Sequence, residues 1–249
     1  MALCELRYSS AALQKQTGAY VILPETGKAP YATLYLLHGL SDDYTIWQRR
    51  TSIERYVAEL PLIVVMPDGG RGFYTDAHEG FAYEKALATE LVDRIDRTFP
   101  TRREREGRCV AGLSMGGYGA LKFALAHPDR FCAASSHSGA LAFGHGPLSP
   151  RDGKPYSPEF QRILGPDPVG GPSDLFALAG KLEPEQRPAV RIDSGVDDQL
   201  IASNREFDAH LTKIGFAHEY AEFPGAHTWD YWDRHIQDTL AFFKDRMSL

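Results

Sequence analysis

The stretch that decides the fold spans residues 108–126 and reads RCVAGLSMGGYGALKFALA. Its first six residues are apolar except for Arg108, which is typical of a buried strand, and residues 116–126 have the composition of a helix that ends before Pro128. Ser114 lies between the two. A serine on so tight a strand-to-helix turn has a strained backbone, and the residues two places before and after it must be very small. Gly112 and Gly116 meet this demand, so the stretch predicts a nucleophile elbow.

Outward from this turn, apolar strands and amphipathic helical stretches alternate, which is typical of an α/β fold with a mostly parallel central sheet and helices on both faces. The runs at 33–37 and 62–66 are continuously apolar, as expected of central strands. The first two strands alternate in polarity and predict a hairpin-type lead-in. We expect strands at residues 3–9, 19–23, 33–37, 62–66, 108–113, 131–135, 189–195 and 218–223, and helices at 52–60, 82–99, 116–126, 204–214 and 229–247.

Residues 138–173 break this alternation. They hold seven of the 16 prolines and are rich in glycine. Long structured loops are often functional, so this Pro/Gly-rich insertion is either a solvated loop or a lid or wall of a nearby active-site pocket. Because no repeat or linker separates a second domain, we expect residues 1–249 to form a single domain.

The composition excludes several classes of protein. Twenty-seven Lys and Arg against 33 Asp and Glu give a net charge of -6 without long single-sign blocks, so we expect neither a nucleic-acid nor a membrane partner. Three scattered cysteines form no disulfide framework or zinc motif, and no His-Glu-x-x-His occurs, so no metal or cofactor is expected. The chain lacks a signal-peptide pattern and an 18-residue apolar run, which predicts a cytoplasmic protein.

A serine nucleophile needs a base and an acid, and in this fold the chain order is Ser, then acid, then His. Of the nine histidines, His210 and His235 lie in predicted helices, and His218 begins a strand. These positions are typical of surface or packed histidines. His227 follows the carboxyl end of the last strand, where a loop side chain can reach Ser114, so we expect it to be the general base.

Three carboxylates in or just after the strand at 189–195 are candidates for the acid. Asp193 falls inside the strand and is the weakest candidate. Asp197 and Asp198 both occupy the turn, and spacing alone does not separate them. One of the two should fix the tautomer of the base and stabilise its imidazolium, and the other is then a solvated turn or helix-capping carboxylate.

The tetrahedral intermediate of an acyl transfer needs two backbone donors on its oxyanion. The fold supplies one from the residue after the nucleophile, Met115, and one from the loop after an early central strand, Leu40. Each donor contributes on the order of 3 kcal/mol to transition-state stabilisation. We expect the neighbouring His38 to hydrogen-bond locally and not to react.

Five ordered blocks carry a family resemblance: YLLHGLSDDYTIWQRRTSIERYV, LIVVMPDGGRGFYTD, AGLSMGGYGALKFAL, SGVDDQLIASN and GAHTWDYW. With these blocks the chain resembles the putative esterase family of the α/β-hydrolase superfamily and is most similar to bacterial tributyrin-esterase-like proteins. Other members are S-formylglutathione hydrolases (esterase D), feruloyl esterase modules and the antigen 85 mycolyltransferases. The resemblance implies an α/β-hydrolase fold over nearly the whole chain.

The resemblance also implies roles for single residues. It makes Ser114 the nucleophile and His227 the base, and it favours Asp198 over Asp197 because Leu200 and Asn204 follow Asp198 at the spacing of the relatives. It gives Leu40 and Met115 to the oxyanion hole. It suggests that Trp47 and Tyr74 line the acyl or alcohol pocket, although core packing would explain either aromatic side chain equally well.

The implied function is a serine carboxylesterase that hydrolyses short acyl, acetyl or aryl esters of small molecules through an acyl-enzyme, without a cofactor. A homo-oligomer would be in keeping with the family. The chain lacks the Ser-Gly-Leu-Thr-Cys block and the Gly-His-Ser elbow of S-formylglutathione hydrolases, which makes that thioesterase activity a minor candidate. An acyltransferase that uses the same three residues is a further enzymatic candidate, and a catalytically silent binding scaffold is the non-enzymatic one.

Overall fold

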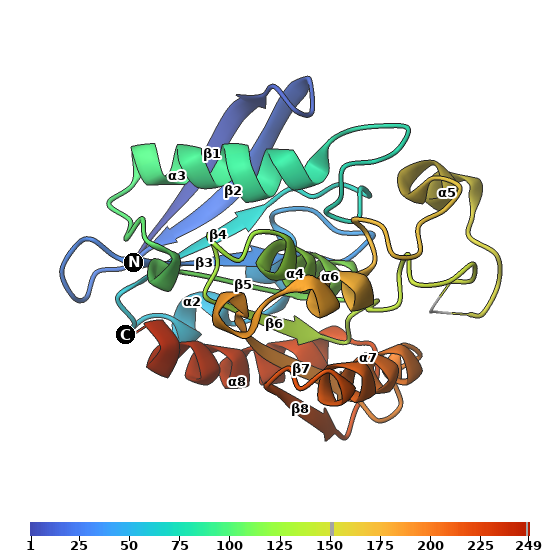
Figure 1. Ribbon diagram of the computed structural model, residues 1–249. Helices are drawn as coiled ribbons and strands as arrows, with labels where there is room; N and C mark the ends of the chain where they lie inside the picture. Colours follow the sequence, from blue (N-terminus) through green and yellow to red (C-terminus); the bar gives the residue numbers. More distant parts are fainter. Residues whose placement is uncertain (150–151, 248) are drawn as a thin grey trace.

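The computed structural model describes residues 1–149, 152–247 and 249 and contains one eight-stranded sheet (Figure 1). Its strand order is β1-β2-β4-β3-β5-β6-β7-β8. The pairs β1 with β2 and β2 with β4 are antiparallel, and all other neighbours are parallel, so the predicted lead-in hairpin and mostly parallel sheet are confirmed. The strands are β1 (Ala2–Ser10), β2 (Lys15–Leu23), β3 (Ala32–Leu37), β4 (Leu62–Pro67), β5 (Arg108–Leu113), β6 (Ala133–His137), β7 (Ala189–Gly195) and β8 (His218–Phe223).

Helices cover both faces of the sheet, as predicted for an α/β fold. Every residue of β3, β4 and β5 is buried, because successive side chains of a strand point to opposite faces and both faces are covered. Figure 1 shows α8 on one side of the sheet and α3 and α4 on the other. One face packs on α1 (Ile46–Arg50), α2 (Ile53–Tyr56) and α8 (Trp229–Met247), and the other on η1 (Lys85–Leu91), α3 (Val92–Thr98), α4 (Met115–Ala126), α6 (Leu175–Lys181) and α7 (Ile201–Lys213).

Several predicted boundaries were wrong. The helix expected at 82–99 begins as the π-helical turn η1 before α3, and the helix expected at 52–60 is reduced to the single turn of α2. The strand expected at 131–135 lies two residues later, as β6. The short 3-10 turns η2 (Arg105–Gly107) and η3 (Pro184–Gln186) precede β5 and β7.

The Pro/Gly-rich insertion contains a helix that was not predicted from the sequence, α5 (Pro158–Leu164). Its start follows a familiar rule: the side chain of Ser157 accepts the N–H of Phe160, and Pro158 occupies the first turn, where a missing N–H costs nothing. Asp174 caps α6 in the same way just after the insertion. Pro150 and Arg151, also within the insertion, lie outside the described residues.

The described helices include none that is both apolar enough and long enough to cross a lipid bilayer.

Candidate active site

Ser114 lies at the sharp turn between β5 and α4, at the carboxyl edge of the sheet. Its φ and ψ angles of 53° and -115° are strained for a residue with a side chain. A Cβ atom on Gly112 would lie 2.4 Å from the backbone oxygen of Gly116, and one on Gly116 would lie 2.4 Å from the backbone oxygen of Leu37. Glycine is therefore required on both sides of the serine, as the sequence pattern predicts.

His227 and Asp198 complete a hydrogen-bonded chain with Ser114. The Nε2 atom of His227 lies 3.0 Å from Ser114 Oγ, and its Nδ1 atom lies 2.9 and 3.1 Å from the two carboxylate oxygens of Asp198. The three side chains come from loops after β5, β7 and β8, which are separated by long stretches of sequence. With Nδ1–H donating to Asp198, Nε2 is free to accept the serine proton.

The environment of Asp198 keeps it ionised. Burial alone would raise the pKa of this carboxyl, but hydrogen bonds and charge attraction from His227, the backbone N–H of Leu200 and the hydroxyl of Ser138 lower it below its usual value. The Leu200 N–H lies 2.8 Å from Oδ1. A carboxylate held in this way orients the imidazole and stabilises its protonated form without taking the proton.

The two other acid candidates lie elsewhere. Asp197 is exposed, and its backbone N–H donates to Gly225 O. Asp193 is fully buried within β7 and pairs with His137, not with His227. Of the three carboxylates, the structure therefore brings only Asp198 to the predicted base.

The two predicted oxyanion donors both line the cavity above Ser114. In the described chain, neither Leu40 N–H nor Met115 N–H donates to another residue. The Gly39 carbonyl accepts a hydrogen bond from His38 Nδ1 at 2.7 Å. Because the C=O and N–H of a trans peptide point in opposite directions, this bond turns the Leu40 N–H away from His38.

His38 is fully buried and bonds locally, as we expected. Its Nε2 atom accepts the N–H of Gly69 at 2.8 Å, and its Nδ1 atom faces only a carbonyl, so the ring is in the Nδ1–H form. The carboxyl of Asp42 lies beside the same loop, and burial raises its pKa. His38 thus holds the loop that carries Leu40, one of the two predicted oxyanion donors.

The cavity around Ser114 has a volume of about 720 Å³. Trp47 and Tyr74 do not line it, contrary to the expectation from the resemblance. Both are almost completely buried in the core, where Trp47 Nε1 donates to Leu37 O and the Tyr74 hydroxyl donates to His38 O. Their bonds support the strand end that carries Leu40. The aromatic lining is formed instead by Phe73, Phe143, Tyr156, Phe160, Trp229 and Trp232.

Three of those aromatic residues, Phe143, Tyr156 and Phe160, belong to the insertion. The ring of Phe143 stacks on Phe73 with 3.7 Å between centroids, and Phe160 meets Phe73 edge-on at 5.1 Å. Arg71, near Phe73, and Glu159, in the insertion, form a bidentate ion pair with distances of 2.7 and 2.8 Å. The aromatic residues clustered in the insertion were the signal that could have identified this lining from sequence.

In the described part of the chain, no three His, Cys, Asp or Glu side chains come together as a metal site. The site consists of protein groups that can move a proton and attack a carbonyl carbon.

Comparisons with known proteins identify the family. The model of the family described as "Putative esterase" matches residues 10–243. An acetyl esterase of Caldicellulosiruptor saccharolyticus is 30% identical over 258 residues, which cover 96% of this chain and 97% of that enzyme. Two solved structures from Staphylococcus aureus each cover 97% of this chain and 98% of their own: the fluorophosphonate-binding serine hydrolase FphF (TM-score 0.85, 31% identity) and the S-formylglutathione hydrolase FrmB (TM-score 0.84, 32% identity).

The family expected from the five sequence blocks is confirmed by these matches, as is the α/β-hydrolase type of the fold. The chain therefore belongs to the putative esterase family.

Proposed function

We propose that this chain is a serine carboxylesterase that hydrolyses short acyl, acetyl or aryl esters of small molecules. The observation that carries the proposal is the hydrogen-bonded chain from Asp198 through His227 to Ser114, with distances of 2.9 and 3.0 Å, at the floor of an open cavity. The names of the similar acetyl esterase and of the fluorophosphonate-binding serine hydrolase support the same chemistry.

The mechanism follows from this geometry. Ser114 Oγ attacks the ester carbonyl while His227 Nε2 takes its proton, and Asp198 stabilises the imidazolium that forms. The N–H groups of Leu40 and Met115 stabilise the oxyanion. His227 then gives its proton to the leaving alcohol, which departs and leaves an acyl group on Ser114. A water activated by the same imidazole attacks the acyl-enzyme and releases the acid.

The cavity lining favours esters with one apolar or aromatic group. The stacked rings of Phe73 and Phe143, together with Phe160, give a flat apolar wall beside the nucleophile. An aryl or short alkyl group buried against them gains roughly 25 cal/mol per Å² of apolar surface. We infer that the insertion acts as this wall of the pocket within a single domain.

Thioester hydrolysis is the second candidate. The S-formylglutathione hydrolase of S. aureus is 32% identical to this chain, although the chain lacks two sequence blocks that are typical of such hydrolases. The same three residues would cleave a thioester, because the fold and the triad determine the acyl transfer and not the leaving group. Acyl transfer is the third candidate. It differs only in its second step, in which an alcohol instead of water attacks the acyl-enzyme.

The test compares hydrolysis of p-nitrophenyl acetate, butyrate and octanoate, and of S-formylglutathione, by the wild type and Ser114→Ala. We expect the wild type to cleave the short esters and to gain the mass of a fluorophosphonate adduct. Ser114→Ala should lose at least about a thousandfold in turnover, and the adduct with it. Retained turnover in Ser114→Ala would overturn the assignment, and turnover confined to S-formylglutathione would favour the thioesterase.

A further inference from the structure

A second cavity lies against the Pro/Gly-rich insertion, beside the cavity around Ser114, which we call the catalytic cavity. Its volume is about 690 Å³, close to that of the catalytic cavity. Its polar lining side chains, such as Glu79 and Arg162, are exposed to solvent. Its apolar lining comes from the insertion and consists of Pro147, Pro155, Pro158, Leu164, Pro166 and Pro168, together with Tyr156. Such a lining can bury a hydrocarbon chain.

Tyr156 separates the two cavities. Of the described residues, it alone lines both. The helix α5, which begins two residues after Tyr156, continues the partition: Phe160 lines the catalytic cavity, whereas Gln161 and Leu164 line the second cavity. The two cavities therefore lie on opposite sides of one wall of the insertion, and this wall is one residue thick at Tyr156.

Three contacts hold Tyr156 in this wall. Its hydroxyl accepts the N–H of Gly144 at 3.1 Å. Its ring meets Phe143 edge-on, with 5.4 Å between centroids. The side-chain amide of Gln161 donates to its backbone oxygen at 2.8 Å. Only 7% of Tyr156 is exposed, so its ring fills the wall and does not extend into solvent.

The position of Tyr156 sets where an apolar chain of the substrate ends. Phe143 stacks on Phe73 and also meets Tyr156, so the aromatic wall beside the nucleophile leads to the tyrosine ring. Each methylene that the transition state buries raises kcat/KM by roughly fourfold. A chain that reaches the ring must turn toward solvent and gains nothing further. A path into the second cavity would let more methylenes be buried.

We propose that Tyr156 is a specificity-determining residue, which closes the catalytic cavity against the second cavity and so restricts the acyl group of the ester to a short chain. We assign the acyl group to the wall of Phe73 and Phe143 because the alcohol must leave beside His227, which protonates it. The proposal rests on the proposed esterase function and refines its substrate class.

The test replaces Tyr156 and compares kcat/KM for p-nitrophenyl acetate, octanoate and decanoate. We expect Tyr156→Ala to raise the ratio of decanoate to acetate at least about tenfold over the wild type, since two or more further methylenes would be buried at roughly fourfold each. Tyr156→Phe keeps the ring and should leave this ratio within about threefold of the wild type. Thermal melting checks folding, and Tyr156→Val carries the test if Tyr156→Ala does not fold.

Gly146→Trp shows whether the gain depends on the second cavity. Gly146 lines the second cavity and not the catalytic one. A Cβ atom there would meet no atom within 4 Å, and the backbone of Gly146 lies outside the region that favours glycine, so a larger side chain has room. We expect the double variant with Tyr156→Ala to lose most of the gain on decanoate. Gly146→Trp alone should leave the ratio of octanoate to acetate within about twofold of the wild type.

The possible outcomes separate this inference from the proposed function. An unchanged ratio in a folded Tyr156→Ala variant, or a gain on decanoate that Gly146→Trp does not reduce, would overturn the inference alone. A lower ratio of octanoate to acetate in Gly146→Trp alone would also overturn it, because the second cavity would then be open to substrate in the wild type. A wild type without Ser114-dependent turnover would overturn the proposed function and this inference together.

Discussion

Replacing Asp198 by Asn should abolish most of the activity, for a reason that follows from two hydrogen bonds. The N–H of Leu200 lies 2.8 Å from Asp198 Oδ1, so an amide at this position must place its oxygen there. Its NH₂ group then occupies the position of Oδ2, 2.9 Å from His227 Nδ1. An amide NH₂ only donates, so Nδ1 must become the acceptor and the proton of the neutral ring moves to Nε2.

A ring protonated on Nε2 cannot accept the proton of Ser114, which lies 3.0 Å from that atom. Loss of the correct tautomer in such a triad costs about 10⁴-fold in kcat, equivalent to roughly 5 kcal/mol. In the opposite orientation the amide oxygen faces His227 and the correct tautomer is kept, but the NH₂ group then faces the Leu200 N–H. Two donors cannot bond each other, and leaving this buried hydrogen bond unmade costs about 1–3 kcal/mol. We therefore expect a loss of at least about a hundredfold if the unmade bond costs the full 3 kcal/mol, and of up to about ten-thousandfold if the amide keeps the first orientation.

The assay is kcat for p-nitrophenyl acetate at pH 7, with thermal melting as the measure of folding. Asp197→Asn is the matched control: the same chemical change one residue earlier, on an exposed side chain that does not touch His227. We expect it to stay within about threefold of the wild type, as for an exposed charge. A folded Asp198→Asn variant with activity within tenfold of the wild type, or a larger loss in Asp197→Asn, would refute the reasoning.

Three further changes test other parts of the structure. Gly112→Ala should lower the free energy of unfolding, measured in urea, by at least about 1–3 kcal/mol, since the new Cβ would lie 2.4 Å from a backbone oxygen of α4. An unchanged free energy of unfolding would contradict this close approach of β5 and α4. Arg71→Ala removes a half-exposed ion pair with Glu159, so it should cost less than about 1 kcal/mol of stability yet change the ratio of octanoate to acetate hydrolysis, and an unchanged ratio would count against the pocket wall. Asp193 and Asp198 both have a lowered pKa in the folded chain, so the stability that their carboxylates provide is present above about pH 4 and is lost as the pH falls through their folded pKa values. The midpoint of urea unfolding should therefore fall between pH 7 and pH 3, and a midpoint that does not change with pH would contradict this.

The parts of the fold that could be predicted depend on short-range patterns. The elbow around Ser114 is determined by sterics within five residues, and the bounds of β5, β7, β8 and α8 agree with the expected ranges. His227 could be proposed because chain order and a loop position leave few other histidines. The choice of Asp198 over Asp197 needed the family resemblance, because both residues occupy the same turn.

The parts that could not be predicted depend on contacts between distant segments. Trp47 and Tyr74 are aromatic and follow strands near the site, but their N–H and O–H groups are used by backbone carbonyls of the core. Sequence alone does not tell whether such a side chain points into the core or into a cavity. The helix α5 was missed because its signals, Ser157 and Pro158, stand among many other prolines.

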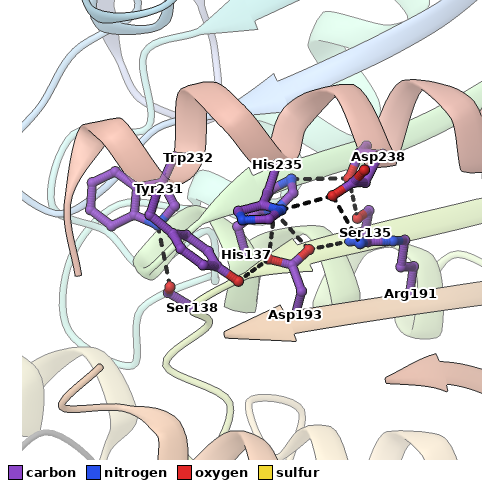
Figure 2. Close-up of polar contacts among 10 residues, drawn as sticks. Ser135, His137, Ser138, Arg191, Asp193, Tyr231, Trp232, His235 and Asp238 are labelled. Carbon is purple, nitrogen blue, oxygen red and sulfur yellow. Dashed lines mark hydrogen bonds and ion pairs between the residues drawn. The ribbon is translucent and has the colours of Figure 1, made fainter. Parts of the chain in front are cut away.

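Among the Asp–His pairs of the described residues, His137–Asp193 (Figure 2) and His227–Asp198 have nearly the same geometry, and their surroundings give them different roles. In each pair a histidine Nδ1 lies 2.9 Å from a carboxylate oxygen, and in each the Nε2 atom faces a hydroxyl, Thr239 at 2.9 Å or Ser114 at 3.0 Å. The Thr239 hydroxyl also bonds Ser135 and is sealed in the core, whereas the Ser114 hydroxyl borders the cavity. Because an ester cannot reach the buried threonine oxygen, the His137–Asp193 pair can only stabilise the packing of the sheet. Access to substrate therefore decides which Asp–His pair can act in catalysis.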